Sequence, residues 1–214
     1  LLKRAIDSGR FGKIFLGNVA VRWSRPQSYY DLDPWKGKKQ LEGGILMNQA
    51  AHHVDLLQWL FGPIDSVMGK AGTMTHNIEA DDTAVAIVKF KNGALATLDA
   101  TTCTNKDLEG SITVFGERGT VKVGGFAVNK IEHWSFKDQH EDDKLVEEVT
   151  TNPPNVYGYG HMGFMKEASD AIRGKENETP DGIDGKRTLE LIEAIYRSVE
   201  TGKEIKLPLN AHHR

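Results

Sequence analysis

The sequence has little cysteine, no long apolar run and almost no net charge, and each of these excludes a class of protein. Cys103 is the single cysteine among 214 residues, so no disulfide can form within the chain, which favours a reducing compartment. No apolar run reaches the roughly 20 residues of a membrane-spanning helix. A formal net charge of −3 and a pI near 6.3 do not indicate nucleic acid or an anionic membrane as a partner. We therefore expect a cytoplasmic protein.

The beginning of the chain also lacks the features of a targeting signal. Residues 1–10 hold four charged side chains (Lys3, Arg4, Asp7 and Arg10) and no apolar segment. The first nine residues are typical of the last turns of a helix that ends at Gly9, and the chain opens on Leu1 rather than Met. We expect a further segment upstream of Leu1; the alternative is a short helix that has lost its initiator methionine.

Hairpin signals dominate the middle of the chain, and helical periodicity brackets them. Alternating apolar residues and turn residues predict strands at 13–23, 66–75, 82–90, 94–102, 110–115, 120–123 and 128–136. Helices are predicted at 45–61, 160–173 and 186–200, and loops at 24–42 and 138–155. This order predicts an α+β fold in one domain over residues 1–214, with a predominantly antiparallel, open-faced sheet and helices on one face.

The periodicity also predicts which surfaces are buried. The helix at 160–173 is expected to bury five apolar residues: Phe164, Met165, Ala168, Ala171 and Ile172. The strands at 82–90 and 94–102 carry apolar residues on both faces, which favours a contact between subunits through the sheet. The alternative is a sheet covered by helices on both faces.

The segment from Gly43 to Asp55 holds the strongest candidate for chemistry. On a helix, Asn48, His52 and Asp55 are spaced i, i+4 and i+7 and share one face. An imidazole with polar neighbours is suited to accept a proton near neutral pH, so His52 is the candidate acid/base; an ordinary polar surface is the alternative. The adjacent His53 points about 100° away around the helix, so the pair cannot easily share a metal ion, and no metal site is predicted.

Other candidate binding residues lie in two loops. The lip at 23–35 is aromatic and basic, and Tyr159 and His161 precede or begin a predicted helix. Neither a Gly-x-Gly-x-x-Gly motif after an opening strand nor a phosphate-binding Gly-Lys-Ser/Thr loop occurs in the chain. The sequence therefore predicts an acid/base residue without a cofactor-binding motif of its own.

Several of these motifs together resemble one known family. They are Trp23-Ser24-Arg25, Tyr29-Tyr30, Trp35-Lys36-Gly37 and Gly43-Gly44-x-Leu46-x-Asn48-x-x-x-His52-x-x-Asp55-Leu56-Leu57. The pattern is similar to the Gfo/Idh/MocA oxidoreductases, but only to their C-terminal, substrate-binding half. That half resembles the C-terminal domain of glyceraldehyde-3-phosphate dehydrogenase in fold. The lip and the Asn-Gln pair before the histidine are most similar to the branch that oxidises UDP-N-acetylglucosamine or its uronic acid at C3.

The resemblance implies a role for each part of the chain. His52 matches the family's catalytic histidine, whereas Asn48 stands where many relatives have aspartate, so it is expected to orient rather than titrate. NAD or NADP would be bound mainly by an N-terminal Rossmann domain that this chain lacks, which leaves the chain alone inactive. The chain would bind a sugar or UDP-sugar and form a dimer or tetramer through its sheet. The expected substrate-binding residues are Asn48, Trp23, Arg25, Tyr29, Tyr30, His53, Asp55, Tyr159 and His161.

Two other functions stay open on the sequence. A binding or regulatory protein without turnover could use the same scaffold, since Asn48 replaces the usual aspartate. An NAD-dependent glycosidase that works through transient oxidation is the other alternative. The particular sugar, the oxidised carbon and the choice between NAD and NADP are left open by the resemblance.

Overall fold

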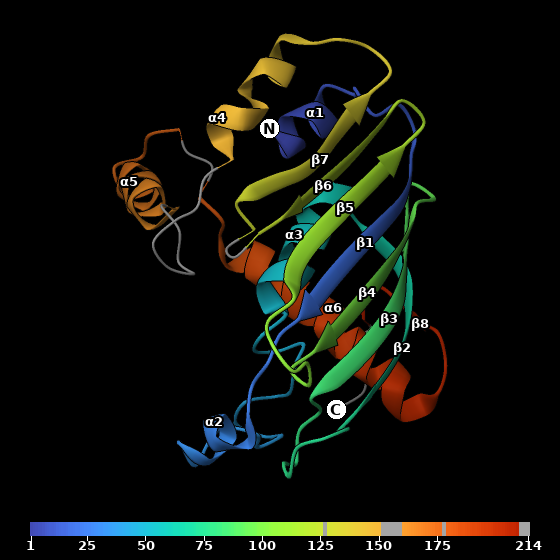
Figure 1. The fold of residues 1–214 in the computed structure, drawn as a ribbon, viewed down its shortest axis with the longest axis vertical. Helices are drawn as coiled ribbons and strands as arrows, with labels where there is room; N and C mark the ends of the chain where they lie inside the picture. The colour runs from blue at the N-terminus through green and yellow to red at the C-terminus, as the bar shows by residue number, and fades with distance from the viewer. Residues whose placement is uncertain (126–127, 151–159, 177–178, 210–214) are drawn as a thin grey trace.

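A computed structural model describes residues 1–125, 128–150, 160–176 and 179–209, and its centre is one eight-stranded sheet (Figure 1). The strand order is β7-β6-β5-β1-β4-β3-β2-β8. The strands are β1 (Ile14–Arg22), β2 (Ile64–Gly72), β3 (Thr83–Phe90), β4 (Leu95–Thr101), β5 (Glu109–Gly116), β6 (Gly119–Gly124), β7 (Lys130–Phe136) and β8 (Ile205–Lys206). Neighbouring strands are antiparallel except β1 and β4, which pair in parallel at the centre. The predicted α+β fold with a mostly antiparallel sheet is confirmed.

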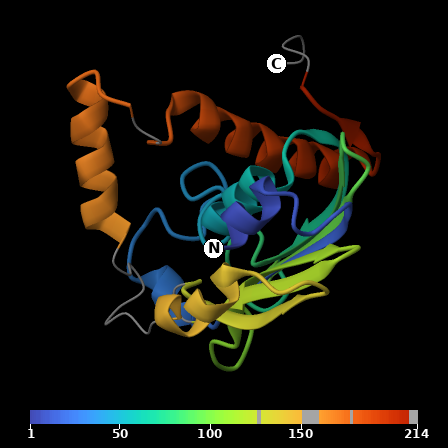
Figure 2. The same ribbon diagram turned by 90° about the horizontal axis from the view of Figure 1, so that it is seen from above.

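Two helices cover one face of this sheet, as Figures 1 and 2 show: α3 (Ala51–Phe61) and α6 (Gly182–Thr201). Leu57 of α3 and Ile195 of α6 are fully buried, as are Val19 and Val21 of β1. Burying a side chain of this size stabilises the fold by roughly 1.5–3 kcal/mol. No helix among the described residues has the length and apolar content needed to cross a membrane.

A close approach between α3 and β1 explains the glycine inside the first strand. A Cβ atom on Gly17 would lie 2.4 Å from the ring of Phe61, so only glycine lets the end of α3 lie this near the sheet. A register shift in β1 lies between Ile14 and Leu16, and Gly17 pairs regularly with Val114.

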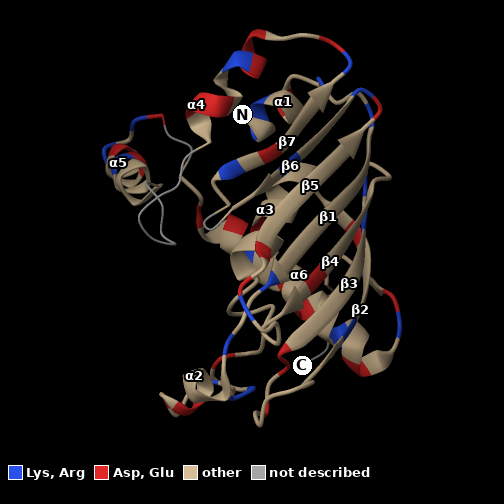
Figure 3. Ribbon diagram, in the orientation of Figure 1, with Lys and Arg blue, Asp and Glu red and all other residues tan. Residues whose placement is uncertain are grey.

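The other face of the sheet is open in the described part of the chain. Val85, Ile87 and Leu95 are 47–58% exposed there. Few charged residues lie along the middle of β1, β3 and β5, as the tan ribbon in Figure 3 shows. The expectation of helices on one face is therefore confirmed, and the alternative of a sheet covered on both faces is wrong for the described residues.

Three expectations for individual elements are corrected. The helix predicted from residue 45 begins at Ala51, and residues 45–50 form turns. The loop predicted at 138–155 contains η1 (Glu141–Leu145) and α4 (Val146–Val149). Helix α5 (Gly160–Ile172) buries none of its residues, because α3 and α6 already cover the sheet and α5 stands apart from it (Figure 2).

The small helices lie at the two ends of the sheet. Helix α1 (Leu2–Asp7) lies near the start of β1 and the C-terminal end of α3, where Lys3 contacts the ring of Trp59. Helix α2 (Gln27–Asp31) follows the other end of β1 (Figure 1). The end of β1 and the start of α3 therefore meet near α2, which is where the candidate site residues lie.

Candidate functional site

A tightly held turn leads into α3. Gly43 and Gly44 have φ angles of +83° and +89°, a region that favours glycine. The N–H of Ile45 donates to the backbone oxygen of Asp81 at 3.1 Å, and the hydroxyl of Tyr196 donates to the Asp81 carboxylate at 3.1 Å. Burial raises the pKa of both Asp81 and Tyr196. These contacts anchor the turns formed by residues 45–50 ahead of α3.

Asn48 lies in this turn and contacts a buried carboxylate. Its Nδ2 donates to Glu42 at 2.5 Å, and Gln49 donates to the same Glu42 oxygen at 3.3 Å. The backbone N–H of Gly37 donates to the other oxygen of Glu42. Glu42 therefore joins Gly37, just after the lip, to the turn. Asn48 lies in this turn and precedes α3, whereas the sequence predicted it to lie on the helix.

The two adjacent histidines at the start of α3 have opposite environments. His52 is exposed, and its ring makes no hydrogen bond to any described residue. His53 is only 3% exposed, and its ring lies 5.8 Å from that of Trp23, centroid to centroid. Burial lowers the pKa of His53 to about 4, with a smaller contribution from His52. Neither ring nitrogen of His53 has a hydrogen-bond partner among the described residues.

Alternating aromatic rings and cations form the lip. The guanidinium of Arg25 lies 5.4 Å from the ring of Trp23 and 5.7 Å from that of Tyr29. The ammonium of Lys36 lies 4.3 Å from Tyr29 and 5.7 Å from Trp35. Cations stacked on aromatic rings are attracted by the ring quadrupole, so these contacts order the side chains. The structure thus brings together Trp23, Arg25 and Tyr29 as a partly exposed surface of aromatic and positive groups.

Tyr30 supports the lip from below. It is buried, and its hydroxyl hydrogen-bonds the hydroxyl of Thr102 at 2.8 Å. Burial raises the pKa of Tyr30 to about 12. Its ring also contacts His76, whose Nε2 donates to the backbone oxygen of Arg25 at 2.7 Å. The Arg25 guanidinium pairs with Asp107 at 3.3 Å, so both its backbone and its side chain are held.

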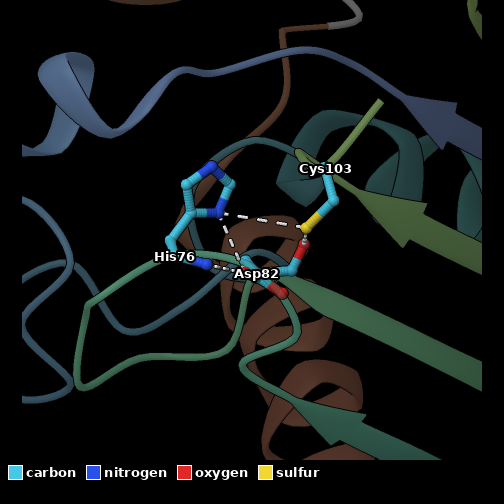
Figure 4. Close-up of side chains that lie close together, drawn as sticks. All are labelled: His76, Asp82 and Cys103. Atoms are coloured by element: carbon cyan, nitrogen blue, oxygen red, sulfur yellow. Dashed lines mark hydrogen bonds and ion pairs between the residues drawn. The ribbon is translucent and has the colours of Figure 1, made fainter. Parts of the chain in front are cut away.

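A compact cluster next to the His76–Arg25 hydrogen bond consists of His76, Asp82 and Cys103 (Figure 4). Their candidate ligand atoms lie within 4.8 Å of one another. The Asp82 carboxylate accepts from the backbone N–H groups of residues 74–76 and from His76 Nδ1. Burial alone would raise the pKa of Asp82, but these donors outweigh it and hold the pKa well below its usual range. Since a metal ion would have to displace these bonds, the cluster is an anchor that ties residues 73–82 to the lip.

Two of the expected binding residues lie away from His52 and the lip. Asp55 accepts a 2.6 Å hydrogen bond from Thr188 of α6 and lines a cavity of about 770 Å³ between α3 and α6, whose lining does not include His52, Asn48 or the lip. His161 is exposed in the first turn of α5, the helix that stands apart from the sheet (Figure 2). Tyr159 lies outside the described residues.

Glu42, Lys36 and His76 also contribute contacts to the site, although none of them was among the expected binding residues and only Lys36 stood in a quoted motif. Glu42 is one acid in a polar stretch, and His76 is isolated in a loop. The only local signal for Glu42 is its position directly before Gly43-Gly44. Their roles follow from contacts between segments that are far apart in the sequence or joined by irregular loops.

The described residues form an open, mostly antiparallel sheet that helices cover on one face. The profile of the Gfo/Idh/MocA "oxidoreductase family, C-terminal alpha/beta domain" matches residues 3–207, and the chain belongs to this family. The resemblance seen in the sequence is thereby confirmed.

Comparison with solved structures points to particular relatives. The chain is 45% identical to the WlbA dehydrogenase of Bordetella pertussis, crystallised with NADH and UDP-GlcNAcA, with a TM-score of 0.92 over 98% of this chain and 61% of that one. The WlbA dehydrogenase of Chromobacterium violaceum, with the same ligands, is 43% identical with a TM-score of 0.89, covering 98% of this chain and 59% of that one. The myo-inositol 2-dehydrogenase of Thermotoga maritima is 26% identical over 96% of this chain and 60% of its own length. The chain thus spans about three-fifths of these relatives.

Proposed function

We propose that this chain is the substrate-binding half of an NAD(P)-dependent dehydrogenase that oxidises a UDP-linked N-acetylated sugar acid or a close relative of it. The observation that carries the proposal is the contact of the aromatic and cationic lip with the start of α3, where Trp23 packs on His53 and the adjacent His52 is exposed. The identity of 45% to a dehydrogenase crystallised with UDP-GlcNAcA supports this substrate class. A positively charged, aromatic lip suits a uracil ring, a diphosphate and a sugar carboxylate.

The nicotinamide cofactor would accept a hydride from the sugar carbon. The described residues offer no cradle for its pyrophosphate, because no strand among them leads through a glycine-rich turn into a helix N-terminus. We infer that NAD or NADP is held mainly by residues outside this chain. The chain alone would then be inactive, and its own contribution is to bind the sugar and to move a proton.

Each residue of the site has a distinct part in this proposal. His52 accepts the proton of the reacting hydroxyl, because its ring is exposed and free of hydrogen bonds to the described residues. Asn48 cannot exchange a proton, so it orients the substrate. Arg25 and Lys36 attract the negative substrate, while Trp23 and Tyr29 hold the two cations in place.

Substitution of His52 tests the proposal in the complete protein encoded by the gene. His52→Asn is expected to lower kcat by about 10²–10⁴-fold, the usual contribution of general acid/base catalysis, with little change in cofactor affinity. His133→Asn, at an exposed histidine on β7, is the matched control and should keep wild-type turnover. The measurement is NADH formation with UDP-GlcNAcA and a panel of free sugars and glycosides.

The outcomes separate the proposal from its rivals. Near-normal turnover of His52→Asn would contradict the role of His52. Binding of the sugar nucleotide without turnover by the complete protein would favour a binding or regulatory protein. Cleavage of a glycoside with release of its aglycone would favour an NAD-dependent glycosidase.

We further propose that the open face of the sheet joins two copies of the protein. Val85, Ile87 and Leu95 form an exposed apolar area at its centre. Apolar side chains gathered on an exposed sheet face favour association, because burial removes their surface from water. A dimer or tetramer of this kind leaves the lip and His52 accessible, because α3 lies on the opposite face of the sheet.

A further inference from the structure

Glu42 is a buried carboxylate, and each of its hydrogen bonds is accepted from an N–H group of the surrounding turns. It is 7% exposed. Its Oε2 accepts from the backbone N–H of Gly37, and its Oε1 accepts from the side-chain amides of Asn48 and Gln49. In the described part of the chain it forms no salt bridge. A buried acid that is satisfied by donors alone constrains which side chain can lie opposite it.

The hydrogen bond from Asn48 to Glu42 determines the orientation of the Asn48 side-chain amide. A carboxylate that receives N–H groups on both oxygens offers only acceptors, so the NH₂ group of Asn48 must face Glu42. The Oδ1 of Asn48 is then directed away from Glu42, and it accepts no hydrogen bond from the described residues. Asn48 is partly exposed, four residues before His52. Its free oxygen is therefore available to a ligand on the exposed side of the turn.

The same contact disfavours an aspartate at position 48. An ionised aspartate would place its oxygens against those of Glu42, at the position where Asn48 Nδ2 now lies 2.5 Å from Oε1. Two carboxylates at this separation repel one another unless they share a proton. The identity of residue 48 and the presence of Glu42 are thus coupled.

We propose that Glu42 is a positioning residue that holds Asn48 with its oxygen toward the substrate. The site then presents a fixed acceptor for a substrate hydroxyl or amide N–H. The role in substrate binding rests on the proposed function, whereas the coupling of Glu42 to Asn48 does not. Glu42 itself touches no substrate in this arrangement.

A double-substitution cycle in the complete protein tests the coupling. Asn48→Asp alone should lower the melting temperature and weaken UDP-GlcNAcA binding by about tenfold or more, because a hydrogen bond is replaced by repulsion. Its binding should recover as the pH falls, since one shared proton removes the repulsion. Adding Glu42→Gln should reverse both losses, because the introduced amide can donate its NH₂ to the new carboxylate at position 48 while its oxygen still accepts from Gly37. The Gln49 amide, which now donates to the same position, then turns to present its oxygen to the introduced NH₂.

Glu79→Gln is the matched control. Glu79 is an exposed acid paired with Lys38, so its substitution removes the same charge close to the site without contacting Asn48. In combination with Asn48→Asp it should restore neither the melting temperature nor binding. Equal rescue by Glu79→Gln, or no rescue by Glu42→Gln, would overturn the inference.

The melting cycle needs no substrate, which keeps the two proposals separable. Rescue of the melting temperature in a protein whose wild type binds no sugar nucleotide would contradict the proposed function and support the Glu42–Asn48 pairing. The other outcome is that the melting temperature is rescued while the wild type, the two single variants and the double variant all bind UDP-GlcNAcA equally well. This result would overturn the part of the inference that concerns the substrate.

Discussion

His52 and His53 are adjacent in the chain, but their surroundings differ. His52 is exposed, whereas His53 lies under Trp23 with a pKa lowered to about 4. A buried imidazole without a hydrogen-bond partner destabilises the fold by its desolvation. We interpret His53 as a neutral packing residue that places Trp23.

The lowered pKa of His53 predicts a pH-dependent stability. Between pH 6.5, the usual pKa of histidine, and about pH 4, His53 is protonated in the unfolded chain but stays neutral in the folded chain. The free energy of unfolding should therefore fall by about 3 kcal/mol as the pH drops through this window, since each pKa unit is worth about 1.4 kcal/mol. His53→Leu should remove this slope and leave stability at pH 7 unchanged or higher. Urea unfolding at pH 7 and pH 4.5 measures both.

Two carboxylates differ from His53 in their pH dependence. The pKa of Asp82 is lowered, so its contribution is complete above its usual value of 3.8 and is lost only as the pH falls below that value. Burial raises the pKa of Asp81, so this group acts with the opposite sign as the pH falls toward that value, and the difference in slope between the wild type and His53→Leu is what reports on His53. An equal slope in the wild type and in His53→Leu would contradict the burial of a neutral His53.

Spacing along the chain predicted part of this site. The Gly43-Gly44 pair and the nearby His52 are local signals, and helical geometry separated His53 from His52 correctly. The burial of His53 depends on Trp23, which follows a different strand. The hydrogen bond between Glu42 and Asn48 depends on irregular turns, in which side chains follow no regular periodicity. Such contacts follow from tertiary structure alone.

At the scale of elements, one buried serine joins α6 to β2. The Oγ of Ser198 accepts from the N–H of Gly69 at 3.0 Å and donates to the backbone oxygen of Lys203 at 2.6 Å. Ser198→Ala leaves two backbone groups unsatisfied, so it should lower the free energy of unfolding by about 2 kcal/mol or more. Ser135→Ala, at an exposed position of β7, should change it by less than about 0.5 kcal/mol. A change for Ser198→Ala as small as that of its control in urea unfolding would contradict this role.

The elements themselves were largely predictable, while their surroundings were not. Alternation of apolar residues located seven of the eight strands, and only the two-residue β8 was missed. Periodicity reports which residues of a helix share a face, but it does not report whether another surface covers that face. For this reason α5 was wrongly expected to be buried. The parallel pairing of β1 with β4 joins distant segments, so no local pattern predicts it.

At the scale of the whole molecule, the open face predicts self-association. The complete protein should be a dimer or larger at micromolar concentration by light scattering. Val85→Lys combined with Ile87→Lys should shift it to the monomer without a loss of helix content, because two charges would be buried in the contact. Leu189→Lys, at an exposed leucine of α6 on the other side of the molecule, is the control. A wild-type monomer, or an oligomer that both variants retain, would contradict the proposed interface.

The central position of β1 has a consequence for synthesis on the ribosome. This strand is translated before the other strands of the sheet, but its two neighbours, β4 and β5, begin only at Leu95 and Glu109. Contacts such as Asn18 with Thr97 and Arg22 with Glu109 span 79 and 87 residues. Closing loops of this length costs entropy before any pairing repays it, which slows folding. Both edges of the apolar β1 strand therefore stay unpaired while roughly 70 further residues emerge, and the nascent chain depends on protection from aggregation until β5 is complete.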